Sequence, residues 1–273
     1  MENKNTNTNK NKGSFWFEIK KEDQYITVNE LMANTYDSFT YFLLLVMSSI
    51  IIAAGILLAN SVILIGGMLI APLLTPVLLV SLGMTTGNLY LIRDSLIKIA
   101  KSISIIVGIS LVVAFIFQIP QDKEFFNAVL FTNTTESAFL YFLVAFASGI
   151  AATFAWIRKK VNNILPGISI TVSLVPPIAM FAIFLISQEF NLARFFLMVF
   201  LFNIVGIIGG SMILFSMFRF YNSHKIIDNN LEKIKKESEE RIKEKQIQKL
   251  ERQKQTIIKA EKAIEEIKNQ LEK

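Results

Sequence analysis

Two apolar segments of this chain carry glycine and proline at matching positions. Gly67 and Pro76 stand in GMLIAPLLTP, and Gly167 and Pro176 stand in GISITVSLVP. Proline lacks an N–H, so it leaves one helix carbonyl without its hydrogen bond. Inside a bilayer that carbonyl has to be satisfied by protein, water or a bound solute. The paired segments therefore predict a path for a small ion or solute between two related halves.

Polar side chains near these prolines are the candidate ligands of the path. Carbonyls freed by proline favour a cation, whereas the amides of a restarting helix favour an anion, so neither charge is preferred. The alternative is structural, because glycine and proline are common in membrane helices, where neighbouring helices absorb a kink. The residues expected to shape the path are Gly66, Gly67, Pro72, Pro76, Gly167, Pro176 and Pro177, and the candidate ligands are Thr75, Ser169, Thr171, Ser173 and Asn203.

The elements that position these residues are apolar runs, each about as long as the ~20 residues that a helix needs to cross hydrocarbon. Six such runs occur, at residues 39–59, 62–82, 96–117, 137–157, 164–186 and 195–218. With 52% hydrophobic residues and a mean hydropathy of +0.47, the chain is too apolar for an ordinary soluble domain. We expect an all-α polytopic membrane protein with six transmembrane helices in residues 39–220.

The broken segments divide this domain into two repeats. A shift of one hundred positions places Gly67 on Gly167 and Pro76 on Pro176. Each half, about residues 39–118 and 137–218, then holds three spans. Because three is odd, the second half enters the membrane from the opposite side, which predicts two inverted three-helix repeats.

Positive charges follow the ends of the spans. Arg93, Lys98 and Lys101 lie just before the third run or near its start, and 158–160 (Arg-Lys-Lys) lie between the fourth and fifth runs. The positive-inside bias places these segments and both termini in the cytoplasm. We therefore attribute the net charge of +6 to basic residues that set the membrane topology, and we expect no nucleic-acid partner.

The two ends of the chain differ from the apolar domain. Residues 1–13 are rich in Asn and Lys and are expected to be a disordered tail. Residues 14–38 form a cytoplasmic lead-in, with a capping box at residues 27–30 (Thr-Val-Asn-Glu) predicting a short amphipathic helix. Residues 222–273 repeat apolar side chains by three and four, which predicts a cytoplasmic coiled coil and a homo-oligomer. The alternative is a solvated single helix.

The chain lacks the residues that several kinds of chemistry need. The chain has no cysteine and one histidine, His224, and its six apolar runs hold no Asp, Glu, Lys or His well inside them. Proton relays through a buried carboxylate are therefore disfavoured. No catalytic group has its partners, so the chain is not expected to be an enzyme or to hold a cofactor or metal.

The motifs themselves resemble a known family. GGMLIAPLLTP at residues 66–76, GISITVSLVPP at 167–177 and FNIV at 202–205 resemble the prokaryotic hydrophobic family called domain of unknown function 389, over about residues 25–220. Gly67 stands where members of that family usually have alanine. The resemblance implies a multi-pass protein of a prokaryotic cell (inner) membrane and supplies no functional residues.

The repeat therefore carries the functional hypothesis. The predicted function is a membrane transporter or channel that passes a small ion or solute between the two Pro-broken helices. The alternative is a non-conducting scaffold or sensor whose spans anchor residues 222–273 to a cytoplasmic protein partner. The expected surroundings are the lipid bilayer and further copies of the chain.

Overall fold

The computed structural model of the chain describes residues 21–36, 38–117, 135–158, 174–223 and 226–236, with the single positions 240, 243 and 247. Every regular element in these ranges is a helix. The chain divides into two compact units, residues 1–226 and 227–273. The tail at residues 1–13 and most of the coiled coil predicted at residues 222–273 lie outside the described residues.

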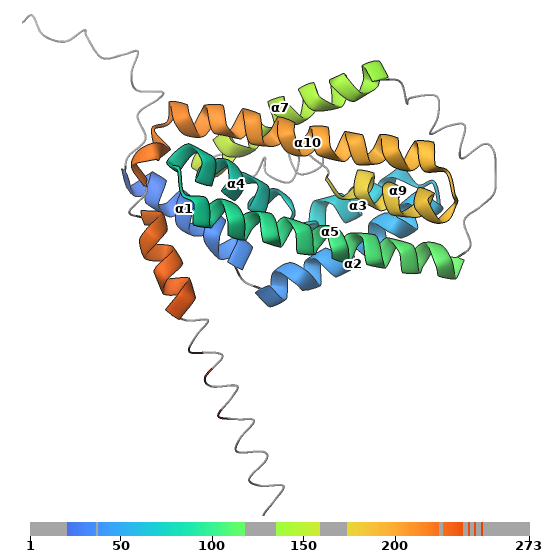
Figure 1. The fold of residues 1–273 in the computed structure, drawn as a ribbon, viewed down its shortest axis with the longest axis horizontal. Helices are drawn as coiled ribbons and strands as arrows, with labels where there is room; N and C mark the ends of the chain where they lie inside the picture. Colours follow the sequence, from blue (N-terminus) through green and yellow to red (C-terminus); the bar gives the residue numbers. More distant parts are fainter. Residues whose placement is uncertain are drawn as a thin grey trace, which may run out of the picture. The chain divides into compact units, whose positions relative to one another are not determined.

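The helices of the first unit differ greatly in length (Figure 1). Two are close to thirty residues long, and two have proline within their first three residues. In chain order they are α1 (Lys21–Tyr36), α2 (Ser38–Leu57), α3 (Ser61–Ile70), α4 (Leu74–Thr86), α5 (Leu89–Phe117), α7 (Thr135–Ile157), α9 (Val175–Ile186), α10 (Phe190–Met217) and the short 3₁₀ helix η2 (Phe220–Ser223).

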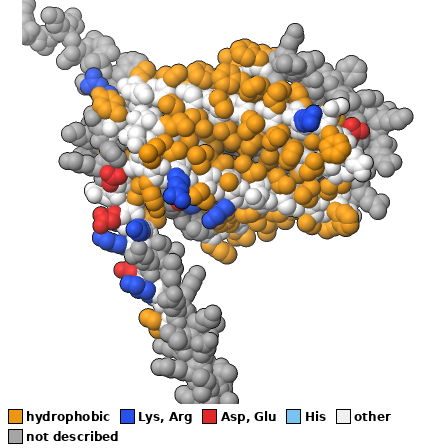
Figure 2. Space-filling view, in the orientation of Figure 1, with side chains coloured by type: hydrophobic (Ala, Val, Ile, Leu, Met, Phe, Trp, Pro, Cys, Tyr) orange, Lys and Arg blue, Asp and Glu red, His pale blue; other side chains and the backbone are white. Residues whose placement is uncertain are grey.

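Four of the described helices are long and apolar enough to cross a membrane: α2, α5, α7 and α10. The pair α3 and α4 passes the same test as one span bent by 50°, and α9 is a shorter apolar helix. The face drawn in Figure 2 is largely covered by hydrophobic side chains. These helices indicate a multi-pass membrane protein, with four to five candidate spans by length and composition among the described residues.

The third predicted span begins earlier than expected. α4 ends at Gly87, which adopts the left-handed region at φ 69°. The side chain of Asn88 then accepts the N–H of Leu91 at 3.0 Å, so α5 starts at Leu89. α5 therefore includes Arg93 and Asp94, which precede the apolar run predicted at residues 96–117. The candidate span Leu89–Phe117 thus has its charged residues in its first half.

The two longest helices, α5 and α10, lie on either side of the short helices α4 and α9. Their colours in Figure 1 show α5 and α10 running in opposite directions. α4 contacts both α5 and α10, and α9 also contacts both. The two short helices therefore occupy the space between the two long ones, α4 toward the start of α5 and α9 toward the start of α10 (Figure 1).

The turn from α4 to α5 recurs between α9 and α10. Gly87 at φ 69° has its counterpart in Gln188 at φ 62°, a separation of 101 residues (188 − 87). The N–H of Asn88 donates to the carbonyl of Gly83 at 3.0 Å, and the N–H of Glu189 donates to that of Phe184 at 3.1 Å. The two helix–turn–helix units therefore share one backbone design.

The buried faces of α5 and α10 follow the same spacing. Every buried position of α5 has a buried position of α10 that lies 101 residues later (192 − 91). The pairs are Leu91 and Leu192, Ser95 and Phe196, Ile99 and Phe200, Ser102 and Asn203, Ile106 and Ile207, Ser110 and Ser211, Val113 and Leu214, and Ala114 and Phe215.

α1 packs across one end of this bundle. It contacts α2, α4, α7 and η2, and Gln24 Nε2 donates to the carbonyl of Phe218 at 3.0 Å while Lys98 Nζ donates to that of Thr35. Thr27 lies in the second turn of α1, where its hydroxyl donates to the carbonyl of Asp23 at 2.7 Å. The capping box predicted at residues 27–30 is therefore wrong, because the helix begins before it.

Candidate functional site

The first broken segment has a clear local cause. α3 ends at Ile70, and Ala71 adopts an extended conformation at φ −67° and ψ 119°. A residue before proline is pushed out of the helical region, so Pro72 ends the helix there. Thr75 Oγ1 then donates to the carbonyl of Pro72 at 3.2 Å, which gives that carbonyl a partner within the chain. The 50° bend between α3 and α4 follows from this break.

The other prolines begin helices rather than break them. Pro76 is the third residue of α4, and Pro176 and Pro177 are the second and third residues of α9. Proline is tolerated in a first turn because its missing N–H would have no partner within the helix. Neither helix has a side-chain cap at its N-cap residue, Leu73 or Leu174. The amides of the restarting helices, which were expected to favour an anion, are therefore fewer than a start without proline would offer.

The two half-helices have opposed directions. α4 runs toward the turn that begins α5, and α9 runs toward the turn that begins α10. Because α5 and α10 run in opposite directions (Figure 1), the two half-helices run from within the bundle to opposite ends of it. α3 also contacts α9, so the first broken segment lies beside the second half-helix. The elements that carry the described path residues are thus linked by contacts of α3 with α9 and of α10 with both half-helices.

The predicted glycines divide into two kinds. A Cβ on Gly67 would lie 2.6 Å from Ile52 Cγ1 and 3.1 Å from the Ile52 nitrogen, so this glycine allows α3 to approach α2. A Cβ on Gly66 would meet nothing within 4 Å. Four predicted residues lie outside the described part of the chain: Gly167, Ser169, Thr171 and Ser173.

Polar side chains missed by sequence reasoning line the buried face of α5. Ser95, Ser102 and Ser110 are each fully buried. Their separations of seven and eight residues keep them on one face of the helix, which was the available signal. The hydroxyls of Ser102 and Tyr41, on α2, form a hydrogen bond of 2.9 Å. The hydroxyls of Ser95 and Ser110 have no hydrogen-bond partner in the described chain.

The predicted amide ligand occupies the matching place on α10. Asn203 is 8% exposed, and it lies 101 residues after Ser102 (203 − 102). Asn60, in contrast, caps α3: its Oδ1 accepts the N–H groups of Val62 and Ile63 at 3.0 and 3.2 Å. Of these two amides, only Asn203 is buried within a long helix.

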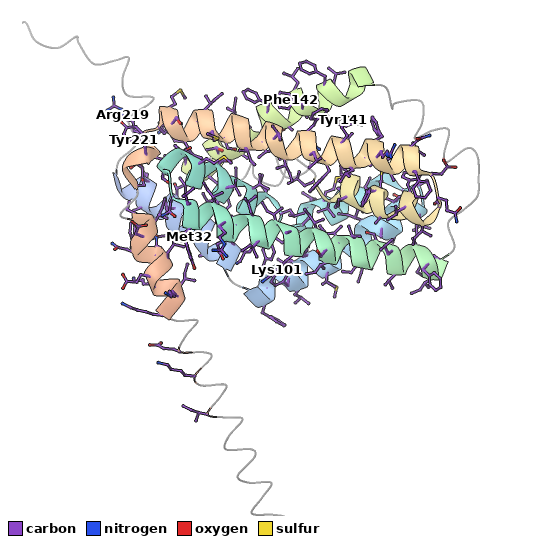
Figure 3. All side chains as sticks on the ribbon, in the orientation of Figure 1. Met32, Lys101, Tyr141, Phe142, Arg219 and Tyr221 are labelled. Atoms are coloured by element: carbon purple, nitrogen blue, oxygen red, sulfur yellow. The ribbon has the colours of Figure 1, made fainter. Side chains whose placement is uncertain are left out.

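Charged side chains gather in the first half of α5. Asp94 Oδ2 is buried without a hydrogen-bond partner in the described chain, and Lys98 lies one turn further along. Lys101 is exposed on the same helix (Figure 3). Among the described residues, no group of three or more His, Cys, Asp or Glu side chains is placed to hold a metal ion.

Comparison with known proteins places this bundle in a family. Residues 68–209, just over half of the chain, match the family described as Domain of unknown function (DUF389). Uncharacterized protein MJ0678 of Methanocaldococcus jannaschii is 27% identical over 180 residues, which cover 64% of this chain and 53% of that protein. The chain thus matches about half the length of this relative. No solved structure matches. The matched region runs from the first broken segment through most of α10, and the chain belongs to the DUF389 family.

Proposed function

We propose that the protein passes a small ion or solute across a membrane between its two halves. The observation that carries this proposal is the pair of short helices α4 and α9, which lie between α5 and α10 and run to opposite ends of the bundle. Helices that start inside a bilayer are costly unless their free backbone groups are buried in protein or face a cavity. Two such starts in matching positions favour a path at the interface of the halves.

The proposal includes two inverted three-helix repeats. Support comes from the shared turn of the two helix–turn–helix units and from the matching burial of α5 and α10. α2 and α7 add a similar match, with a separation of 100 residues (145 − 45). Their buried pairs are Leu45 and Ala145, Ser48 and Ser148, Ser49 and Gly149, Ile52 and Ala152, and Ala53 and Thr153.

The membrane arrangement of the proposal has six spans, counting the bent pair as one and α9 as part of another. Arg93 and Arg194 are both exposed and lie 101 residues apart (194 − 93), near the starts of α5 and α10. Arginine is favoured at membrane interfaces, so this pair fits opposite bilayer surfaces. Both termini then lie in the cytoplasm of a prokaryotic cell, and residues 222–273 join copies of the chain.

Flux from liposomes tests this function. The purified protein is reconstituted and offered K⁺, Cl⁻, urea and glycerol, each in turn. Pro72→Ala removes the cause of the α3–α4 break. Proline disfavours a continuous helix by ~3 kcal/mol, so its loss is expected to change the flux rate about tenfold or more. Val62→Ala, at an exposed position of the same α3 helix, is the matched control and should leave the rate unchanged. The proposal fails if no species crosses at verified reconstitution, and the scaffold alternative then stands.

A further inference from the structure

α5 carries three fully buried serines along one face, Ser95, Ser102 and Ser110, here called the serine track. Their separations correspond to about 10–12 Å along the helix axis, so the track covers much of the buried length of α5. This face of α5 belongs to a helix that contacts α2, α4 and α9. The track therefore lies on a helix that contacts both halves, and its middle serine, Ser102, faces Tyr41 of α2.

Two hydroxyls of the track differ from the other described serines on these helices. The hydroxyls of Ser49, Ser81 and Ser104 each donate to the carbonyl four residues earlier, at 2.6, 3.2 and 3.0 Å. Those of Ser95 and Ser110 have no such bond within the described chain, although both are fully buried. A buried hydroxyl without a partner is unfavourable, and a hydrogen-bonding solute would supply the missing partner.

The surroundings of the track carry little net charge, because the charged side chains beside Ser95, Asp94 and Lys98, lie one turn apart on α5 and have opposite signs. Among the described residues, the buried positions of α4, α5, α9 and α10 include no charged side chain. Pro76, Pro176 and Pro177 also remove first-turn N–H groups from the starts of α4 and α9, where an anion would otherwise bind. An ion entering a low-dielectric site needs opposite charge or many dipoles, whereas an uncharged solute needs only hydrogen bonds.

We propose that the serine track is the wall of the path and that the path takes a small uncharged solute with hydrogen-bonding groups. This inference rests on the proposed function and narrows it to one class of solute. Ser95 and Ser110 exchange hydrogen bonds with the solute as it passes. Ser102 stays bonded to Tyr41 and fixes the middle of the track.

Cysteine labelling tests the wall directly, because the chain has no cysteine of its own. The variants Ser95→Cys and Ser110→Cys are reconstituted and treated with a membrane-impermeant methanethiosulfonate reagent. Ser104→Cys is the matched control, since Ser104 lies on the same helix but is exposed on another face. Both track cysteines should react faster than the control, and urea or glycerol should slow the reaction. Equal reactivity at the three positions, or no slowing by either solute, would overturn the inference.

The flux assay separates this inference from the function on which it rests. Urea or glycerol should cross while K⁺ and Cl⁻ do not, and Ser110→Ala should lower the rate about fivefold, equivalent to one hydrogen bond. Flux of ions alone would leave the proposed function standing and overturn the uncharged class. Absence of all flux would overturn the proposed function itself.

Discussion

The two halves of the bundle share a backbone design but hold their helices together in different ways. In the second half, α7 and α10 approach closely through Gly149, Gly206 and Gly210, here called the glycine clasp. A Cβ on Gly149 would lie 2.5 Å from the carbonyl oxygen of Ile207, and one on Gly206 would lie 2.8 Å from that of Phe142. Ser211 Oγ also donates to the carbonyl of Gly149 at 3.2 Å.

The first half lacks this clasp. The positions of α5 that correspond to Gly206 and Gly210 are Ile105 and Ile109, whose side chains do not permit the close backbone approach that glycine allows. α2 instead approaches α3 through Gly55 and Gly67, and it reaches α5 through the hydrogen bond from Tyr41 to Ser102. The second half is thus locked by backbone contact, whereas the first half keeps polar side chains between its helices. This difference favours α5 over α10 as the wall of the proposed path.

The largest expected effect comes from filling the glycine clasp. Gly210→Ala places a methyl group against the carbonyl oxygen of Phe146, which is backbone and cannot move aside. Overpacking of this kind destabilises by about 1–3 kcal/mol. Chemical unfolding in detergent should show the loss.

Gly108→Ala is the matched control for the clasp. Gly108 lies on α5, and an added Cβ there would meet nothing within 4 Å. Because alanine favours a helix over glycine, this variant should be neutral or more stable by up to about 1 kcal/mol. An equal loss in both variants would show that the contrast between the halves is wrong.

A smaller effect is expected from the polar contact of the first half. Tyr41→Phe removes the hydrogen bond to Ser102 and leaves the ring in place, so it should destabilise by about 0.5–1.5 kcal/mol. Tyr141→Phe is the matched control, because Tyr141 lies 100 residues later (141 − 41) on α7 and is 40% exposed. Unfolding of both variants in the same detergent should show a loss for Tyr41→Phe alone.

The smallest effect is expected outside the apolar bundle. Glu232 and Lys236 form an ion pair whose side chains are 66% and 70% exposed. Exposed pairs of this kind contribute little, so Glu232→Gln should leave the unfolding midpoint of the protein unchanged within error. A clear fall in the unfolding midpoint would mean that this ion pair stabilises more than the helix that contains it.

The sequence was sufficient for the features that depend on composition and on single residues. Long apolar runs predicted a helical membrane protein, and Pro72 predicted the break that separates α3 from α4. Features that depend on partners were harder to predict. Asn88 starts α5 early because its side chain caps the helix, and this brings Asp94 into a candidate span. Asn60 similarly caps α3, a role that depends on the two N–H groups it accepts.

The candidate site was predicted in part for the same reason. Proline positions marked where helices begin, but their place in the first turn of α4 and α9 follows from the whole bundle. The shift of one hundred residues paired Pro76 with Pro176, whereas the turns pair Pro76 with Pro177, 101 residues apart (177 − 76). The serine track was not predicted, because a serine in an apolar helix usually donates a hydrogen bond to its own backbone. Only their burial without a partner distinguishes Ser95 and Ser110 from such serines.

The opposed direction of the two halves is the claim on which the path depends, and sided labelling tests it most directly. Leu89→Cys and Phe190→Cys place single thiols at the starts of α5 and α10, where the native residues are 79% and 59% exposed. An impermeant thiol reagent is added outside intact cells, and then again after permeabilisation. The account predicts that Phe190→Cys reacts from outside and that Leu89→Cys reacts only after permeabilisation. Reaction of both from the same side would contradict the inverted arrangement and the path built on it.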